Sequence, residues 1–414
     1  MPVIPLPPEP TAYSRALARL WNEIADVGRH AATGGYRRFA WTSEDLTLRD
    51  WFAAAADQRG LTITMDRALN QWAWWGDPDE GALKGTPGLV LGSHLDSVPD
   101  GGPYDGPLGV VSALAALEVL RDNGFEPSRP IAVACFGDEE GARYGVACAG
   151  SRLMTGALAP DHALALRDRD GATMAEAIGR AGFNPEQIAA DPVALQRVGT
   201  FIELHVEQGR GLVDQAAPVG VASSIWPHGR WRFEFDGEAN HAGTTRLVDR
   251  RDPMLTYAHA VMAARRAAEH HEALATFGKV QVEPNGVNAI PSRVTAWLDS
   301  RAADAAAVHD VVGDLRSTGA RVTEESWTDE TVFDTQLRDR LAGLLAGADG
   351  QPAPVLPTGA GHDAGIMSQA MVETAMLFVR NPTGVSHSPE EFAEEADCIA
   401  GVEALARVVQ DLAS

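Results

Sequence analysis

Histidine and carboxylate side chains stand at the end of, or soon after, four short apolar stretches of the sequence. They stand in the segments Gly92-Ser-His-Leu-Asp96, Gly137-Asp-Glu-Glu-Gly141, Glu203-Leu-His-Val-Glu207 and Ser386-His-Ser-Pro-Glu-Glu391. Imidazole and carboxylate donors without a thiolate suit zinc, cobalt, nickel or manganese in a hydrolytic site. If the four segments meet in space, the sequence predicts a metal-assisted hydrolase.

Each segment taken alone also fits a plainer interpretation. A single His-x-Asp is more often a structural histidine with its hydrogen bonds satisfied, and Glu139-Glu140 is typical of a solvated loop. Neither interpretation explains why all four segments follow predicted buried strands. The glycine-rich loop 98–107 is an ordinary turn on its own, yet it places Asp105 eleven residues after His94, able to fold back to the same point.

The apolar stretches have the length of buried strands, and helical spacing recurs elsewhere. The predicted strands are Gly88–Gly92, Pro130–Phe136, Thr200–His205 and Thr374–Val379. The predicted helices are Thr11–His30, Glu44–Arg59, Val110–Asn123 and Ala396–Leu412. Strands that alternate with helices indicate an α/β domain with a largely parallel sheet, in which ligands bind beyond the carboxyl ends of the strands.

The middle of the chain has a different pattern. Alternating strands and helices are predicted at Trp231–Phe235, Asp252–Glu272, Lys279–Glu283, Val294–Asp299, Ala303–Thr318 and Arg321–Ser326. Their order, β-α-β-β-α-β, is that of a small α+β unit of the split βαβ type. We therefore expect a domain at residues 218–329, inserted into an α/β domain formed by residues 1–217 and 330–414.

The composition excludes some classes of function. Lys and Arg number 34 while Asp and Glu number 57, so the net charge of −23 disfavours nucleic-acid phosphates and anionic membranes as partners. No apolar run approaches the roughly 18 residues of a membrane span, and the first residues do not resemble a secretory signal. The cysteines are few, odd in number and in no C-x-x-C pair: Cys135, Cys148 and Cys398. We therefore expect a cytoplasmic protein with small, buried thiols.

Taken together, the segments resemble the two-metal amidohydrolases. The blocks that carry this resemblance run in order from residue 88 to residue 392: Gly92–Gly106, Asp138–Gly141, Glu203–Gly209, Gly237–Thr245, Gly359–Ala364 and Ser386–Glu390. This group contains N-carbamoyl-L-amino acid hydrolases, allantoate amidohydrolases and β-ureidopropionases, and it is related to co-catalytic zinc aminopeptidases and aminoacylases. The resemblance implies an aminopeptidase-like catalytic domain and an inserted ferredoxin-like domain that serves as lid and dimerisation domain.

The resemblance also implies roles for single residues. Glu139 would be the general base, and Asp96 would orient the imidazole of His94. Asp105 would bridge two divalent ions, zinc with manganese, cobalt or nickel as alternatives. The implied ligands of these two ions are His94, Asp105, Glu140, His205 and His387.

The substrate contacts are implied in the same way. His241 would stabilise the developing oxyanion, and Arg301 with Asn288 would bind a substrate carboxylate. Further pocket candidates are Gln208, His228, Gly361 and His362. The chain departs from the family pattern at Tyr104, at Arg246-Leu247 and at Ser224–Gly229, and the last two departures bear on the substrate pocket or an interface.

The predicted activity is hydrolysis of the carbamoyl (ureido) C–N bond of a small anionic substrate by a homodimer. Allantoate or an N-carbamoyl-L-amino acid would yield ammonia, carbon dioxide and the free amine. The 378–384 stretch favours allantoate weakly. An aminoacylase or dipeptidase on the same scaffold is the alternative. A binding protein without catalysis is a third class, which the intact set of ligands and base disfavours.

Overall fold

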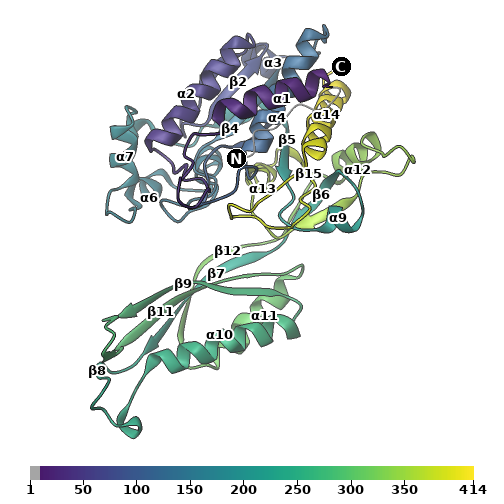
Figure 1. Ribbon diagram of the computed structural model, residues 1–414. Coiled ribbons are helices and arrows are strands. Elements are labelled where there is room, and N and C mark those ends of the chain that lie inside the picture. Colours follow the sequence, from purple (N-terminus) through teal and green to yellow (C-terminus); the bar gives the residue numbers. More distant parts are fainter. Residues whose placement is uncertain (1–9) are drawn as a thin grey trace. The chain divides into compact units, whose positions relative to one another are not determined.

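The computed structural model describes residues 10–414 and divides into two compact units (Figure 1). Unit 1 comprises the described chain up to Ser223 together with Val332–Ser414, and unit 2 comprises Ser224–Thr331. The division falls after Ser223, whereas the sequence places it after residue 217. The reason is that β6 (Val219–Ile225) pairs with β15 (Glu373–Val379) in the sheet of unit 1.

Unit 1 is built on one mixed sheet with the strand order β1-β2-β4-β3-β5-β15-β6-β13, to which β14 adds beside β6. The central pairs β4–β3, β3–β5 and β5–β15 are parallel, whereas β1–β2, β2–β4 and β15–β6 are antiparallel. The largely parallel sheet of the prediction is thus limited to its centre. The remaining strands are β1 (Thr62–Met65), β2 (Gln71–Trp75), β3 (Gly88–His94), β4 (Ile131–Phe136), β5 (Val198–Val206), β13 (Thr331–Val332) and β14 (Val355–Thr358).

One large core covers one face of this sheet. It joins α1, α2, α4, α12 and α14 to inward side chains of the central strands, and α4 is buried over most of its length (Figure 1). Helix α13 packs against the strands β5 and β15 and against helix α5. The helices of unit 1 are α1 (Ala12–Ile24), α2 (Ser43–Gln58), α3 (Pro78–Leu83), α4 (Pro107–Asp122), α5 (Ala149–Thr155), α6 (Pro160–Ala165), α7 (Met174–Arg180), α8 (Pro192–Gln196), α9 (Gly211–Asp214), α12 (Thr335–Leu344), α13 (Asp363–Gln369) and α14 (Glu395–Leu412).

Unit 2 has the element order β-α-β-β-α-β that the sequence predicts, folded as an antiparallel sheet with strand order β12-β7-β11-β9. The buried side chains of β7 alternate, and they form a core with α10 and α11. A short ribbon of β8 and β10 lies in the same unit. The bounds are β7 (His228–Asp236), β8 (Asn240–His241), α10 (Pro253–His270), β9 (Leu274–Glu283), β10 (Ala289–Ile290), β11 (Arg293–Arg301), α11 (Ala305–Arg316) and β12 (Arg321–Thr328).

Two predicted elements have different lengths in the structure. The first helix ends at Ile24 and not at His30, because the guanidinium of buried Arg38 donates hydrogen bonds to the carbonyls of Ile24 and Val27. Strand β9 begins at Leu274, whereas only its second half alternates clearly in sequence. None of the helices in residues 10–414 is long and apolar enough to cross a lipid bilayer.

Candidate active site

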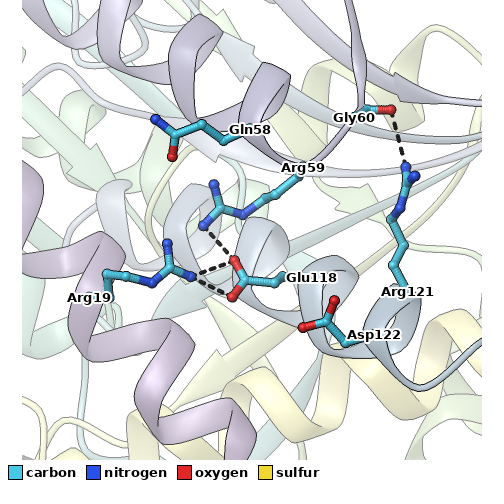
Figure 2. Close-up of a pocket in the computed structure, with 7 residues that line it drawn as sticks. All are labelled: Arg19, Gln58, Arg59, Gly60, Glu118, Arg121 and Asp122. Carbon is cyan, nitrogen blue, oxygen red and sulfur yellow. Dashed lines mark hydrogen bonds and ion pairs between the residues drawn. The ribbon is translucent and has the colours of Figure 1, made fainter.

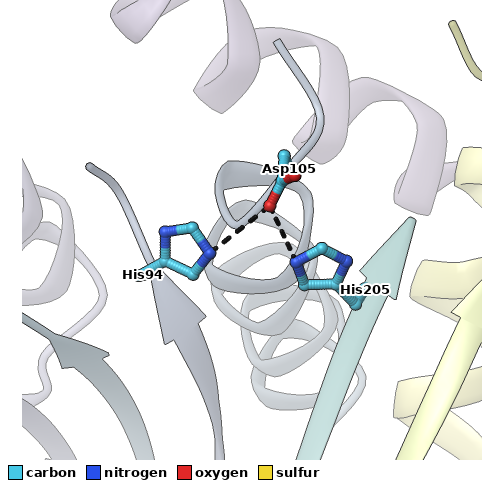
Figure 3. Close-up of side chains that lie close together, drawn as sticks. All are labelled: His94, Asp105 and His205. Atoms are coloured by element: carbon cyan, nitrogen blue, oxygen red, sulfur yellow. Dashed lines mark ion pairs between the residues drawn. The ribbon is translucent and has the colours of Figure 1, made fainter. Parts of the chain in front are cut away.

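The strand ends of unit 1 bring two histidines and an aspartate together (Figure 3). His94 ends β3 and His205 lies near the end of β5, and both imidazoles are fully buried. Asp105 Oδ1 lies 3.1 Å from His205 Nε2 and 3.6 Å from His94 Nε2. Since β3 and β5 are parallel neighbours, their carboxyl ends lie at the same edge of the sheet, which brings the two histidines together.

A second group shares the same aspartate. His387 Nε2 lies 3.4 Å from Asp105 Oδ2 and 3.4 Å from Glu140 Oε2. Within each of these groups, one candidate ligand atom per residue lies within 4.8 Å of the others. Asp105 therefore presents one carboxylate oxygen to each group, which is the geometry of a residue that bridges two ions.

Hydrogen bonds fix the ring orientation of the two buried histidines. Nδ1 of His94 faces the main-chain carbonyl of Asp96 at 3.2 Å, and Nδ1 of His205 faces that of Val206 at 2.8 Å. Nδ1 therefore donates in both rings, so Nε2, on the side of Asp105, is the nitrogen that can give up its proton and bind a cation. Neither Nε2 has a hydrogen-bond partner among the described residues, although both are buried. Two buried imidazole nitrogens and one carboxylate that face a common point fit divalent cations as ligands.

The charges of this cluster explain its pKa shifts. Burial opposes a charged imidazole, but the facing carboxylates of Glu139 and Asp105 outweigh it and raise the pKa of His94 well above its usual value. Burial likewise opposes the charge of Asp105, yet the neighbouring histidines, led by His205, hold its pKa well below its usual range. Histidine ligands thus carry protons that a bound cation would displace.

Glu139 lies beside the first group without belonging to either. Its Oε2 is 3.6 Å from His94 Nε2, and its Oε1 accepts a hydrogen bond from the thiol of Cys148 at 3.2 Å. Burial raises its pKa well above the usual value, despite the opposing charge of His94. A carboxylate with a raised pKa next to the ligands suits the general base that the resemblance implies.

Asp96 holds the loop that carries Glu139 and Glu140. Its Oδ1 accepts the main-chain N–H of Glu139 and its Oδ2 accepts that of Glu140, each at 3.1 Å. Asp138, which precedes the two glutamates, has φ of 53°. Glu139 then lies beside His94 and Glu140 beside His387, so the two carboxylates reach different parts of the cluster. Asp96 thereby positions the loop as well as the ring of His94.

Gly106 follows the bridging aspartate and has φ of 84°. A Cβ at this position would lie 2.4 Å from Cε1 of His94. Only glycine permits both this backbone conformation and the close approach of the ring.

The sequence-predicted residues of unit 2 lie in two places within that unit. His241 is exposed on β8, paired with Ala289 of β10, and its Nδ1 accepts the N–H of Gly243 at 3.0 Å. Asn288 precedes β10, and its carbonyl accepts the N–H of Ala242 at 2.9 Å. Elsewhere, Arg301 pairs with Asp299 at 2.7 Å and lies opposite His228 in the β7–β11 register.

The remaining predicted residues belong to unit 1. The amide of Gln208 donates to Asp105 Oδ2 at 2.8 Å, so this side chain supports the carboxylate that the two groups share. The ring of His362 lies 4.4 Å from that of His205, and Gly361 directly precedes it.

Several buried polar residues of the site were not predicted from the sequence. Glu203 accepts hydrogen bonds from the hydroxyl of Ser93 and the N–H of Ala364, and Asp363 accepts one from Ser151. The signal for Glu203 was its place two residues before His205, on the same side of β5. Nothing in the sequence distinguished Ser151 or Cys148.

A surface depression of about 520 Å³ lies at the other end of α4 (Figure 2). Glu118 forms ion pairs there with Arg19 and Arg59, while Arg121 donates to the carbonyl of Gly60 at 3.1 Å. Asp105 precedes the first residue of α4, and a helix of 16 residues spans about 24 Å. We therefore interpret this depression as a structural junction of α1, α2 and α4, remote from the histidine cluster.

The fold and the cluster define the chain as a member of a class of metal-dependent hydrolases. It belongs to peptidase family M20/M25/M40, which it matches over residues 90–411. It is 35% identical to the N-carbamoyl-L-amino acid amidohydrolase of Geobacillus stearothermophilus, covering 95% of this chain and 98% of that protein. It is 31% identical to the allantoate amidohydrolase of Escherichia coli, covering 97% and 99%. An amidase of the hydantoinase/carbamoylase family from Burkholderia vietnamiensis has a similar crystal structure, with a TM-score of 0.87, 29% identity and 97% of each chain covered.

Proposed function

We propose that the chain hydrolyses the carbamoyl C–N bond of an N-carbamoyl-L-amino acid or of allantoate. The observation that carries this proposal is the shared carboxylate of Asp105, with one oxygen facing each of two ligand groups and Glu139 beside them. Curated relatives that span the whole chain are named for these two substrates. We propose two divalent cations per chain, zinc in the first place, with manganese, cobalt or nickel as alternatives.

The reaction follows from the positions of the side chains. Cations held by the two groups would polarise the ureido carbonyl and acidify water. Glu139 accepts a proton from the attacking water at its Oε2, which faces the cluster, and returns it to the departing nitrogen. The balance is one ureido group and one water to one amine, one ammonia and one carbon dioxide.

We propose that residues of unit 2 complete the substrate contacts, and that unit 2 is the lid domain that the family resemblance implies. In neutral His241, Nδ1 accepts the Gly243 N–H, so the proton resides on Nε2, where it can stabilise an oxyanion. Asn288 and Arg301 are proposed to bind the substrate carboxylate, and His228 to line the pocket. In unit 1 we assign Gly361 and His362 to the same pocket.

Assembly as a homodimer is a further part of the proposal. Strand β9 is at the margin of its sheet and has an unpaired outer edge among the described residues. It exposes Leu274 and Val280, and the neighbouring α10 exposes Leu255 and Met262. Edge strands and apolar patches of this kind favour pairing with another chain. Val280→Lys should give a monomer by light scattering, and an unchanged mass would contradict this arrangement.

We also propose a reducing, cytoplasmic location, which the free and buried state of all the cysteines supports.

The test of the activity is a panel of substrates. Metal-loaded protein should release ammonia from N-carbamoyl-L-amino acids or allantoate. The same panel, extended to β-ureidopropionate and repeated with Zn, Mn, Co and Ni, identifies the preferred substrate and the preferred cation. Glu139→Gln should lower turnover by about 10²- to 10⁴-fold while the metal content is unchanged. Faster hydrolysis of an acylated amino acid or a dipeptide would replace the carbamoylase assignment by that of an aminoacylase or dipeptidase.

A further inference from the structure

A buried carboxylate near the end of the chain holds the turn that carries Asp105. Oε2 of Glu391 accepts the main-chain N–H of Tyr104 at 2.7 Å and that of Asp105 at 3.1 Å. The side chain of Glu391 is buried, and a Cβ at Gly102 would lie 2.3 Å from it. The loop therefore packs directly against this carboxylate, and its backbone position depends on Glu391.

The other oxygen of Glu391 reaches the side chain of Asp105 through a hydroxyl. Ser386 Oγ lies 3.2 Å from Glu391 Oε1 and 3.1 Å from Asp105 Oδ2. The amide of Gln208 donates to the same Oδ2 at 2.8 Å and to Ser386 Oγ at 3.1 Å. Main chain and side chain of Asp105 are thus held by one connected set of hydrogen bonds.

The same set holds the second ligand group together. Ser386 directly precedes His387, whose Nε2 lies 3.4 Å from Asp105 Oδ2. Glu391 therefore joins the two segments that must meet for the second group to form. Hydrogen-bond partners of ligands commonly set metal affinity in this way.

We infer that Glu391 is a positioning residue that keeps Asp105 in its bridging orientation and so couples the two cation sites. The inference rests on the two-cation site of the proposed function. Glu390 next to it is an internal control, because its exposed carboxylate bonds only to Ser388 in the described structure.

The test is a titration of metal-free protein with Co²⁺, followed by calorimetry and by the visible spectrum of the ion. Wild type and Glu390→Ala should bind two ions per chain with the same spectrum. Glu391→Ala should weaken the binding of one ion by about 10- to 100-fold and change its spectrum. Glu391→Gln should restore binding to within a few-fold of wild type, because its amide oxygen still accepts both N–H groups and its amide donates to Ser386.

Wild-type affinity, stoichiometry and spectrum in Glu391→Ala would overturn the inference, as would a single ion in the wild type. If circular dichroism shows that Glu391→Ala is unfolded, Ser386→Ala carries the test, with the same loss expected and Ser388→Ala as its control. These measurements use no substrate. Wild type that binds two ions without cleaving any ureido substrate would therefore refute the proposed function and leave this inference intact.

Discussion

The two ligand groups that share Asp105 are built in different ways. In the first, His94 and His205 stand on adjacent parallel strands and their side chains have no exposure. In the second, Glu140 and His387 come from loops, and the side chain of His387 is 52% exposed. His387 also has φ of 55°, so a turn of the loop, and not a strand, sets its direction. The difference indicates a preformed first site and a second site that depends on loops being held in place.

The largest expected effect is the loss of turnover when a histidine is removed from the first group, compared with the same change in the second group. His205→Ala should lower turnover by about 10³-fold or more, because it removes a buried ligand whose ion stabilises the transition state by several kcal/mol. His387→Ala should lose less, and excess cation should restore part of its activity. Steady-state kinetics at rising cation concentration checks both variants. Equal losses, unaffected by added cation, would contradict the difference between the groups.

Removal of the cations should release them in order. A chelator of graded strength should take the ion of the second group first and that of the first group last, in two steps followed by metal analysis. Full removal should lower the free energy of unfolding by about 2.7 kcal/mol for each ion that had been present at 100 times its Kd. Thermal melts at each step measure this loss. A single step in which both ions leave together would indicate that the two groups bind their ions with similar strength, and would contradict the difference between them.

Binding at the second group should strengthen with pH. Burial opposes the charge of His387, but contact with Asp105 and the charge of Glu140 raise its pKa to about 9 in the metal-free chain. The free chain therefore holds a proton below about pH 9 that the cation-bound chain does not. Burial raises the pKa of Glu140 in the same group to about 7, so one proton is displaced between about pH 7 and pH 9. Affinity should rise about tenfold per pH unit over that range and then level off. Calorimetry in buffers of different ionisation enthalpy measures the released proton, and His387→Ala should release one proton fewer.

The smallest expected effect concerns the buried side of the cluster. Cys148→Ala removes the thiol that donates to Glu139, and a hydrogen bond of about 0.5–1.5 kcal/mol corresponds to about a two- to tenfold loss in kcat. Cys398→Ala, on the buried side of α14, is the control and should leave kcat unchanged. If both variants behave alike, Cys148 has no part in orienting Glu139.

The sequence predicted the side chains that the structure brings together in the cluster, but not the groups that hold them in place. His94, Glu139, His205 and His387 could be found because each follows an apolar run, and strand ends of a parallel sheet meet at one edge. The family resemblance supplied their separate roles.

The contacts of Glu391 could not be predicted, since they join residues far apart in the chain through main-chain groups that have no sequence signature. Gln208 illustrates the same limit: the resemblance placed it in the substrate pocket, but its hydrogen bond to Asp105 could not be predicted. Strand β2 was missed because its Gln-Trp-Ala-Trp-Trp sequence is buried on both faces and shows no alternation.

The helix that follows the bridging aspartate has a consequence for the resting protein. Asp105 lies two residues before α4, which begins at Pro107 and is buried along its length. The aligned peptide dipoles of such a helix place partial positive charge at its first turn, next to the carboxylate. This contribution comes from the backbone, so neither the loss of a cation nor a side-chain substitution in the cluster removes it. The metal-free protein therefore already holds a negative charge at Asp105, between the two groups that an arriving cation would meet.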